Sequence, residues 1–247
     1  MTDIKWCIDY LSRYNGIRIP ANMNDEQAFR ALQNVTMPQE LSDEFYARQD
    51  AALREILSRK KVTDVSDFPD GITLYKGDIT LLKADAIVNA CNNRMLGCFV
   101  PGHHCIDNAI HSFAGLQVRR DMMKVMKEQG HDEPNGDCKV TIGYNLPARY
   151  ILHTVGPIYS GKKQDEIDLE SCYRSCLQTA DKMGLGSVVF CCLSTGIFGY
   201  PIEEATEIAV RTVRAYLRTQ NKNIKKVVFN VFTERDYDVY QRILARD

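Results

Sequence analysis

The sequence lacks the features that mark several classes of protein. Its formal net charge is −1, so it has no overall basic character that would indicate a nucleic-acid partner. No apolar run approaches the roughly 20 residues of a membrane span, and the start has no secretion signal. Internal repeats and low-complexity tracts are also missing. We therefore expect neither a membrane nor a nucleic acid as a partner.

The nine cysteines are odd in number and follow no disulfide-framework spacing. Scattered thiols of this kind are typical of a reducing compartment, where they are free or bound to metal. We therefore expect a cytoplasmic protein. With 45% hydrophobic and 26% charged residues, the chain has the composition of a globular protein that buries a full core.

Apolar residues recur at helical spacing through residues 3–60, with breaks at turn residues. This segment contains no motif for chemistry, and we interpret it as a helical cap on the main domain, with a partner-docking arm as the alternative. Residues 60–71 are rich in Asp, Ser, Pro and Gly and predict a boundary loop. The predicted organisation is a helical N-terminal extension over 1–68 and a main domain over 69–247.

Strand-like and helix-like segments alternate after this loop. The strand-like segments, rich in β-branched and aromatic residues, are 72–75, 86–88, 140–144, 150–155, 188–193 and 227–232. The helical patterns lie at about 105–128, 165–183, 202–219 and 235–245. This alternation favours an α/β fold whose sheet is covered on both faces and is mixed rather than purely parallel.

One stretch, Gly97–Gly115, combines two cysteines, two adjacent histidines, a turn and a helix start. The Val-Pro-Gly turn can bring Cys98 back against His103 and Cys105. Two thiolates and an imidazole suit zinc, and three ligands leave the fourth tetrahedral position open. The alternative is that the cysteines are small core residues and the histidines surface or capping residues, because this is not a standard zinc-finger spacing.

Asp107 and His111 lie four residues apart at the start of the predicted helix, and therefore on one face. A metal-binding loop that leads into a helix carrying a carboxylate predicts a reaction centre. The competing interpretations are a helix N-cap for Asp107 and a buried structural hydrogen-bonding role for His111.

Two loops that leave predicted strands are unusual. The amide-rich run Asn89–Asn93 follows a strand, and ligands of open α/β sheets bind at the carboxyl ends of strands. The run Ser194–Pro201, STGIFGYP, precedes a helix whose N-terminus favours an anion, and its glycines let backbone N–H groups approach a ligand. It has no P-loop lysine and does not match G-x-G-x-x-G, so a tight strand-to-helix turn is the alternative.

Together these pieces resemble the macrodomain family, whose members bind ADP-ribose on an α/β/α fold. The resemblance implies a three-layer α/β/α macrodomain with a central mixed sheet over about residues 72–247. Four motifs in the family's order carry it: Gly77–Thr80 (GDIT), Ile87–Asn92 (IVNACN), Ile106–His111 (IDNAIH) and the diphosphate loop Ser194–Pro201.

The resemblance implies roles for individual residues. Asp78 takes the adenine amino group, Asn92 bonds the distal ribose hydroxyls, and Phe232 stacks on adenine, with ordinary core packing as the alternative for Phe232. The implied substrate-binding residues are Asp78, Ile79, Asn92, Ser194, Thr195, Gly196, Ile197, Phe198, Gly199, Tyr200 and Phe232.

The insertion Cys98–Cys105 replaces the glycine-rich substrate loop of many hydrolytic macrodomains. It resembles the zinc-containing microbial macrodomains, which also carry a helical N-terminal extension. The resemblance implies Cys98, His103 and Cys105 as ligands of Zn2+, with His104 as the alternative to His103.

The family implies a hydrolase that removes mono-ADP-ribose from a modified, acidic side chain of a protein by cleavage at the ribose C1″. Asn92 and Asp107 are the implied catalytic residues. Zinc would orient ribose and water rather than strongly acidify the water, because two thiolates cancel its formal charge. The implied partners are ADP-ribose and an ADP-ribosylated protein, such as a lipoyl-carrier protein modified by a sirtuin-like transferase. The alternatives are a non-catalytic ADP-ribose-binding module and an O-acyl-ADP-ribose esterase.

Overall fold

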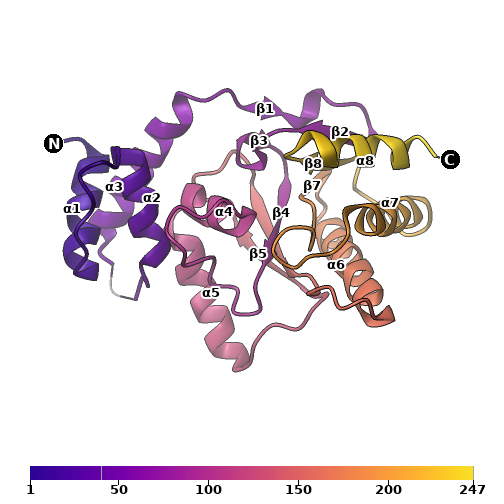
Figure 1. The fold of residues 1–247 in the computed structure, drawn as a ribbon. Coiled ribbons are helices and arrows are strands. Elements are labelled where there is room, and N and C mark those ends of the chain that lie inside the picture. The colour runs from indigo at the N-terminus through magenta and orange to yellow at the C-terminus, as the bar shows by residue number, and fades with distance from the viewer. Residues whose placement is uncertain (40, 247) are drawn as a thin grey trace.

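The computed structural model of the chain describes residues 1–39 and 41–246. Three helices at the N-terminus stand beside a larger α/β body (Figure 1). They are α1 (Asp3–Asn15), α2 (Asp25–Val35) and α3 (Asp43–Ser58). The predicted helical extension is therefore present, while its exact boundary at residue 68 stays a prediction. Across the described ranges, no helix is both long enough and apolar enough to cross a bilayer.

Local sequence signals explain where these helices begin and end. Asn24 and Gln27 form a reciprocal capping box at the start of α2, and the Ser42 side chain accepts from the Phe45 N–H at the start of α3. Gly16, with φ of 67°, ends α1 in the left-handed conformation. The inward apolar stripes form a separate small core, which contains Cys7, Leu11, Phe29, Leu32, Phe45 and Leu53, and to which Leu116 of the α/β body also contributes.

The α/β body is built on a six-stranded sheet in the order β2-β8-β7-β4-β6-β5. Five neighbouring strands are parallel and β5 pairs antiparallel with β6 at the edge, so the predicted mixed sheet is confirmed. The strands are β2 (Gly71–Lys76), β4 (Ala86–Cys91), β5 (Cys138–Ile142), β6 (Tyr150–Val155), β7 (Ser187–Phe190) and β8 (Lys226–Val231).

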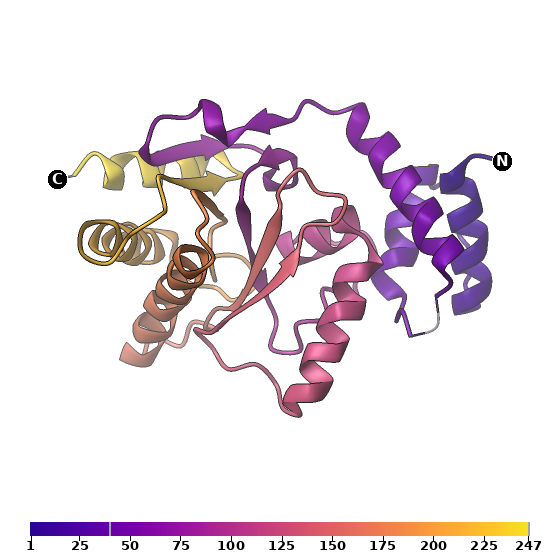
Figure 2. The same cartoon turned by 180° about the vertical axis from the view of Figure 1, so that it is seen from behind.

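Helices cover both faces of this sheet, which confirms the three-layer α/β/α fold (Figures 1 and 2). One layer contains α4 (Ile106–Ala114) and α5 (Leu116–Gln129), and the N-terminal helices lie outside it. The other layer contains α6 (Lys163–Lys182), α7 (Ile202–Thr219) and α8 (Glu234–Leu244). The central strands β4, β7 and β8 are mainly apolar and buried, as expected for parallel strands covered on both faces.

Several boundaries differ from the sequence-based prediction. The helical pattern at 105–128 is two helices, because Gly115 has φ of 104° and breaks the helix between α4 and α5. Strand β4 continues to Cys91 instead of ending at residue 88, and β7 ends at Phe190 instead of residue 193. The predicted boundary loop contains a two-residue strand, β1 (Thr63–Asp64), that pairs in parallel with β3 (Leu82–Lys83).

Arg119 joins the N-terminal helices to the sheet body. Its side chain comes from α5, only 1% of the residue is exposed, and its Nη1 donates to the carbonyl oxygens that end α2. These acceptors are Gln33 at 2.9 Å, Asn34 at 2.9 Å and Thr36 at 2.6 Å. The last carbonyls of a helix have no hydrogen-bond donor within the helix and carry a partial negative charge. A buried guanidinium supplies both the missing donors and the opposite charge.

We predict that Arg119→Met lowers the free energy of unfolding by about 3 kcal/mol or more, because it leaves several buried carbonyls without donors. Arg120→Met is the matched control, since Arg120 is the next residue and makes a partly exposed ion pair with Asp121 at 3.2 Å. We expect the control to cost less than about 1 kcal/mol. Urea unfolding measures the free energy of unfolding of both variants. Equal losses would contradict the role of Arg119 in joining the N-terminal helices to the sheet body.

Candidate active site

The carboxyl ends of the parallel strands bring the predicted site residues to one edge of the sheet. Strands β4 and β7 pair only through Ala86–Val188 and Ile87–Val189, after which β4 continues alongside β6 alone. The loop after β4 begins at Asn92, and the loop after β7 contains the diphosphate motif 194–201. Such a point, where neighbouring strands part, is where open α/β sheets bind ligands.

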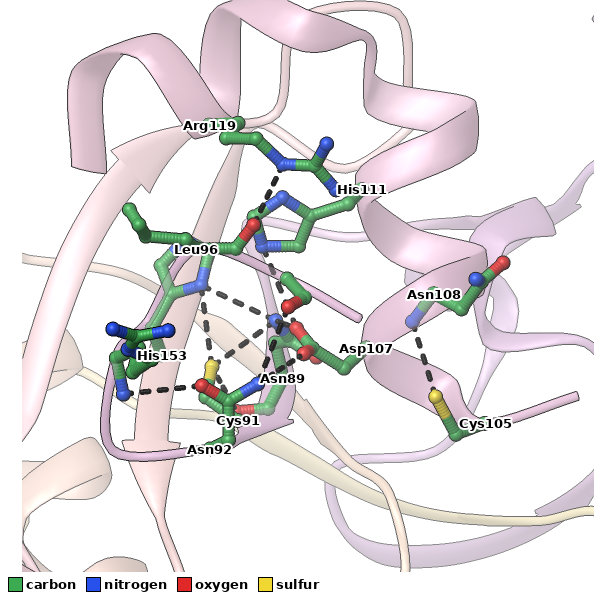
Figure 3. Close-up of polar contacts among 12 residues, drawn as sticks. Asn89, Cys91, Asn92, Leu96, Cys105, Asp107, Asn108, His111, Arg119 and His153 are labelled. Carbon is green, nitrogen blue, oxygen red and sulfur yellow. Dashed lines mark hydrogen bonds and ion pairs between the residues drawn. The ribbon is translucent and has the colours of Figure 1, made fainter. Parts of the chain in front are cut away.

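Asp107 lies in the first turn of α4 and points back toward β4 (Figure 3). Only 5% of this residue is exposed. Its Oδ1 accepts from Asn89 Nδ2 at 2.9 Å, and its Oδ2 lies 3.5 Å from Asn92 Nδ2. The two residues with predicted catalytic roles, Asn92 and Asp107, are therefore side by side. Asn89, on β4, orients the carboxylate through its hydrogen bond to Oδ1.

The charge state of Asp107 reflects opposing influences. Burial raises the pKa of Asp107 to about 6, while the hydrogen bond from Asn89 and the positive charge of Arg119 oppose that rise. Burial likewise lowers the pKa of Arg119 to about 10, and Asp107 opposes that change. The two buried charges therefore stabilise each other's ionised forms.

The alternative interpretation of Asp107 as a helix N-cap and the predicted hydrogen-bonding role of His111 are both wrong. The N-cap of α4 is Cys105, whose Sγ accepts from the Asn108 N–H at 3.4 Å, and Asp107 caps nothing. His111 is buried beside Asp107, with Nε2 at 3.4 Å from Oδ1, yet within the described residues neither ring nitrogen makes a hydrogen bond. The spacing of four residues correctly predicted that Asp107 and His111 lie together, but it did not predict their hydrogen bonds.

Behind Asn89 lies a buried histidine that sequence reasoning left without a role. His153 of β6 has its Nε2 2.8 Å from Thr141 Oγ1 and its Nδ1 3.3 Å from Asn89 Nδ2. Complete burial lowers the pKa of His153 to about 3, so this imidazole is neutral at physiological pH. The alternation of side chains along β5 and β6 is the only sequence signal for this contact, and it needs the strand register to be known.

The turn at 100–102 brings the predicted metal ligands together, as expected. The nearest ligand atoms of Cys98, His103 and Cys105 all lie within 4.8 Å of one another. Cys98 Sγ is 3.6 Å from His103 Nδ1. In the described part of the chain this is the one such group of three or more His, Cys, Asp and Glu side chains. His104 is not a member of the group.

The diphosphate motif forms a compact loop ahead of α7. Ser194 adopts φ of 63°, and the N–H groups of Tyr200 and Gly199 close the loop onto the carbonyls of Ser194 and Gly196, each at 3.0 Å. Among the described residues, the N–H groups of Gly196, Ile197 and Phe198 have no acceptor within the protein. The loop therefore presents free backbone donors next to a helix N-terminus.

Within this loop the side chains differ in exposure. Ile197 is 76% exposed, whereas Tyr200 is 5% exposed and packs on the ring of Tyr159 at 4.7 Å. Thr195 is half-buried and donates to the Cys192 carbonyl at 3.3 Å. Phe198 is half-buried, and its carbonyl accepts from the Tyr159 N–H at 2.8 Å. The loop after β6 thus supports the loop after β7.

The predicted adenine end lies at the neighbouring strand pair, β2 and β8. Asp78 follows β2, and its Oδ1 accepts from Thr80 N at 2.9 Å and Thr80 Oγ1 at 2.6 Å. Phe232 follows β8 directly and is 77% exposed, so it is not part of the core. Ile79, in contrast, is 2% exposed and packs inside.

The chain belongs to the Macro domain family, whose model matches residues 88–209. A protein-ADP-ribose hydrolase of Staphylococcus aureus (strain MSSA476) is 48% identical over 93% of this chain and 88% of its own length. The protein-ADP-ribose hydrolase of Treponema medium is 44% identical over 96% of both chains.

Solved structures agree with this membership. A Trypanosoma brucei macrodomain in complex with ADP-ribose is 33% identical over 86% of this chain and 94% of its own, with a TM-score of 0.68. An Oceanobacillus iheyensis macrodomain with ADP is 36% identical, covers 69% of this chain and 88% of its own, and has a TM-score of 0.64.

We predict that Gly196→Glu abolishes ADP-ribose binding without unfolding the protein. A Cβ added at Gly196 meets no atom within 4 Å, so the fold tolerates a side chain, but the carboxylate would repel the diphosphate. Calorimetry with ADP-ribose measures the effect. Gly196→Ala is the matched control and should keep the wild-type affinity within a few-fold. Unchanged affinity in Gly196→Glu would mean that the loop does not bind the diphosphate.

Proposed function

We propose that this protein is a zinc-dependent protein ADP-ribosylhydrolase that removes mono-ADP-ribose from modified acidic side chains by cleavage at the ribose C1″. The observation that carries the proposal is a buried carboxylate, Asp107, beside Asn92 on a helix whose N-cap, Cys105, belongs to a cluster of three metal-ligating side chains. Relatives named protein-ADP-ribose hydrolase, 44% and 48% identical over nearly the whole chain, support it.

The donor set of the cluster and one of its ligand separations support a zinc site. Bonds of about 2.3 Å to sulfur and 2.0 Å to nitrogen imply tetrahedral ligand separations of roughly 3.5 Å. The 3.6 Å between Cys98 Sγ and His103 Nδ1 agrees with that value. We propose that Cys98, His103 and Cys105 hold Zn2+, and that a fourth position stays open. A zinc ion in such a site supplies Lewis-acid polarisation of an oxygen ligand.

Different residues of the protein contact different parts of the ADP-ribose group. The free N–H groups of the 194–200 loop and the N-terminus of α7 bind the diphosphate, with Asp78 and Phe232 at adenine. Asn92 donates to the distal ribose hydroxyls. Asp107 accepts the proton of the attacking water, and Asn89 keeps its second oxygen from turning away.

Two other functions are compatible with the same fold. A non-catalytic module would bind ADP-ribose and release nothing, and an esterase would act on O-acyl-ADP-ribose alone. The buried carboxylate and the three-ligand cluster favour an enzyme over a binding module, because binding alone needs neither, while an esterase would use the same site with a smaller leaving group. Substrates for the assay include a lipoyl-carrier protein modified by a sirtuin-like transferase, the target that the family resemblance implies.

We predict that Asp107→Asn lowers kcat by on the order of 10² or more while leaving ADP-ribose affinity within a few-fold. Asparagine keeps the shape and the acceptor for Asn89 but cannot take a proton. Mass spectrometry follows ADP-ribose release from proteins modified on Asp or Glu, on Ser and on Arg.

The wild-type protein decides between the three functions in the same assay. Release from Asp- or Glu-linked protein supports the hydrolase. No release from any protein, with normal ADP-ribose binding, would identify a binding module, and release from O-acyl-ADP-ribose alone would identify an esterase. Full activity in Asp107→Asn would remove Asp107 from the reaction.

We also predict about one zinc per chain by elemental analysis, and its loss in Cys98→Ser, which replaces a soft thiolate with a poor ligand. Cys138→Ser is the matched control, since Cys138 lies on the edge strand β5 outside the cluster, and it should keep the zinc. A metal-free wild type, or a Cys98→Ser variant that retains its zinc, would contradict this site.

A further inference from the structure

The loop that carries the three ligands has little regular structure of its own. Residues 92–105 lie between β4 and α4, outside any helix or strand. Within it, one turn hydrogen bond joins the Met95 N–H to the Asn92 carbonyl at 3.0 Å, and another joins the His103 N–H to the Val100 carbonyl at 3.2 Å. Side chains hold other backbone groups of the loop. Arg119 Nε, from α5, donates to the Leu96 carbonyl at 2.6 Å, and Asn92 Nδ2, from the loop itself, donates to the Gly97 carbonyl at 3.2 Å.

Helix α2 of the N-terminal extension supplies two further contacts, and both fall on the ligand-bearing turn. Arg30 Nη2 donates to the carbonyl of His103 at 2.9 Å. Asn34, which is 1% exposed, accepts from the Gly102 N–H at 2.9 Å through Oδ1. The two residues are four apart and therefore share one face of α2. One helix face thus holds the Pro101–Gly102 and His103–His104 peptide groups, which lie on either side of the ligand residue.

Arg30 acts on the same loop a second time through Asn108. Its Nε and Nη2 both donate to Asn108 Oδ1, at 3.0 and 2.7 Å. This fixes the amide so that Nδ2 donates to the Val100 carbonyl at 2.9 Å. The Asn108 N–H meanwhile reaches Cys105 Sγ (Figure 3). A single guanidinium therefore orients the start of the turn, its end and the residue that contacts the last thiol.

Helix α2 is itself held in place, by hydrogen bonds to α4 and to Arg119 of α5. Asn34 Nδ2 donates to Ser112 Oγ at 2.8 Å, and Gln33 Nε2 lies 3.3 Å from the Ser112 carbonyl, so α2 is locked against α4. The same stretch of α2 ends on the Arg119 guanidinium. Helix α2 is consequently a rigid surface with respect to the turn, which is what a support for metal ligands requires.

We infer that Arg30 and Asn34 are positioning residues for the metal-binding loop, which makes the N-terminal extension a working part of the site rather than a cap. The inference rests on the zinc site of the proposed function. Arginine is specifically suited, because its planar fork bonds the His103 carbonyl and Asn108 at once, whereas lysine offers one compact ammonium group.

The test compares Arg30→Ala with Arg59→Ala. Arg59→Ala is the control because it removes another arginine contact to α2. Arg59 Nη2 lies 3.0 Å from Glu26 Oε1 of α2, in an exposed ion pair that does not touch the loop. Zinc affinity is measured by competition with a chromophoric chelator. We expect Arg30→Ala to weaken zinc binding by about 10- to 100-fold, the range for residues that orient metal ligands, and the control to match the wild type. Arg30→Lys should fall between the two.

A second readout needs no metal. Peptide mass spectrometry gives the alkylation rates of Cys98 and Cys105 in the zinc-free protein, and we expect both to rise several-fold in Arg30→Ala, with Cys138 unchanged. Circular dichroism checks the fold, and Arg30→Lys carries the test where Arg30→Ala does not fold.

The two readouts separate the inference from the proposed function. A wild type without zinc would contradict the metal site, and the alkylation rates would still show whether α2 orders the loop. Zinc affinity and alkylation rates both equal to wild type in a folded Arg30 variant would overturn the inference. With the metal site intact, kcat should fall in Arg30→Ala. ADP-ribose affinity should stay within a few-fold, because the diphosphate loop follows β7, whereas the loop held by Arg30 follows β4.

Discussion

The buried guanidinium of Arg119 connects parts of the molecule that lie far apart in the sequence. It binds the carbonyls at the end of α2, donates to the Leu96 carbonyl in the loop that carries Cys98, His103 and Cys105, and lies over the ring of Phe99 at 4.3 Å. Burying a charge is costly unless it is fully hydrogen-bonded or paired. These backbone acceptors, together with the nearby charge of Asp107, satisfy the guanidinium, so each of these segments depends on the others being in place.

This dependence links the extension to the chemistry of the site. Helix α2 is fixed at its end by Arg119, and from that position Arg30 and Asn34 reach the turn that carries His103. Asp107 lies two residues beyond Cys105 on α4, so the ligand loop and the carboxylate share one support. A site built on rigid elements holds its reacting groups within the narrow tolerances that catalysis needs.

Periodicity and motif spacing predicted much of this arrangement. The alternation of segments predicted the three layers, and helix α7 was predicted with its exact bounds. The turn at 100–102 correctly predicted that Cys98 lies against His103. These features depend on neighbouring residues, and the information for them is local.

What sequence reasoning missed depends on contacts between distant segments. Gly115 splits α4 from α5 because its φ is positive, and a helical pattern does not reveal φ. The register of β5 on β6 pairs Thr141 with Ile151 and so places Thr141 diagonally next to His153, and no single strand carries that information. Arg30 and Arg119 belong to no motif in the sequence, and only the packing of the extension onto α4 and α5 gives them buried acceptors.

The central claim is that one preorganised site combines Zn2+, Asp107 and the distal ribose of ADP-ribose. A crystal structure of the ADP-ribose complex, with diffraction data collected on both sides of the zinc absorption edge, tests it most directly. The account predicts one anomalous peak bonded to Cys98, Cys105 and a histidine nitrogen of residue 103, with the distal ribose between that peak and Asp107. An absent peak, a peak on His104 or elsewhere, or a distal ribose remote from Asp107 would contradict it.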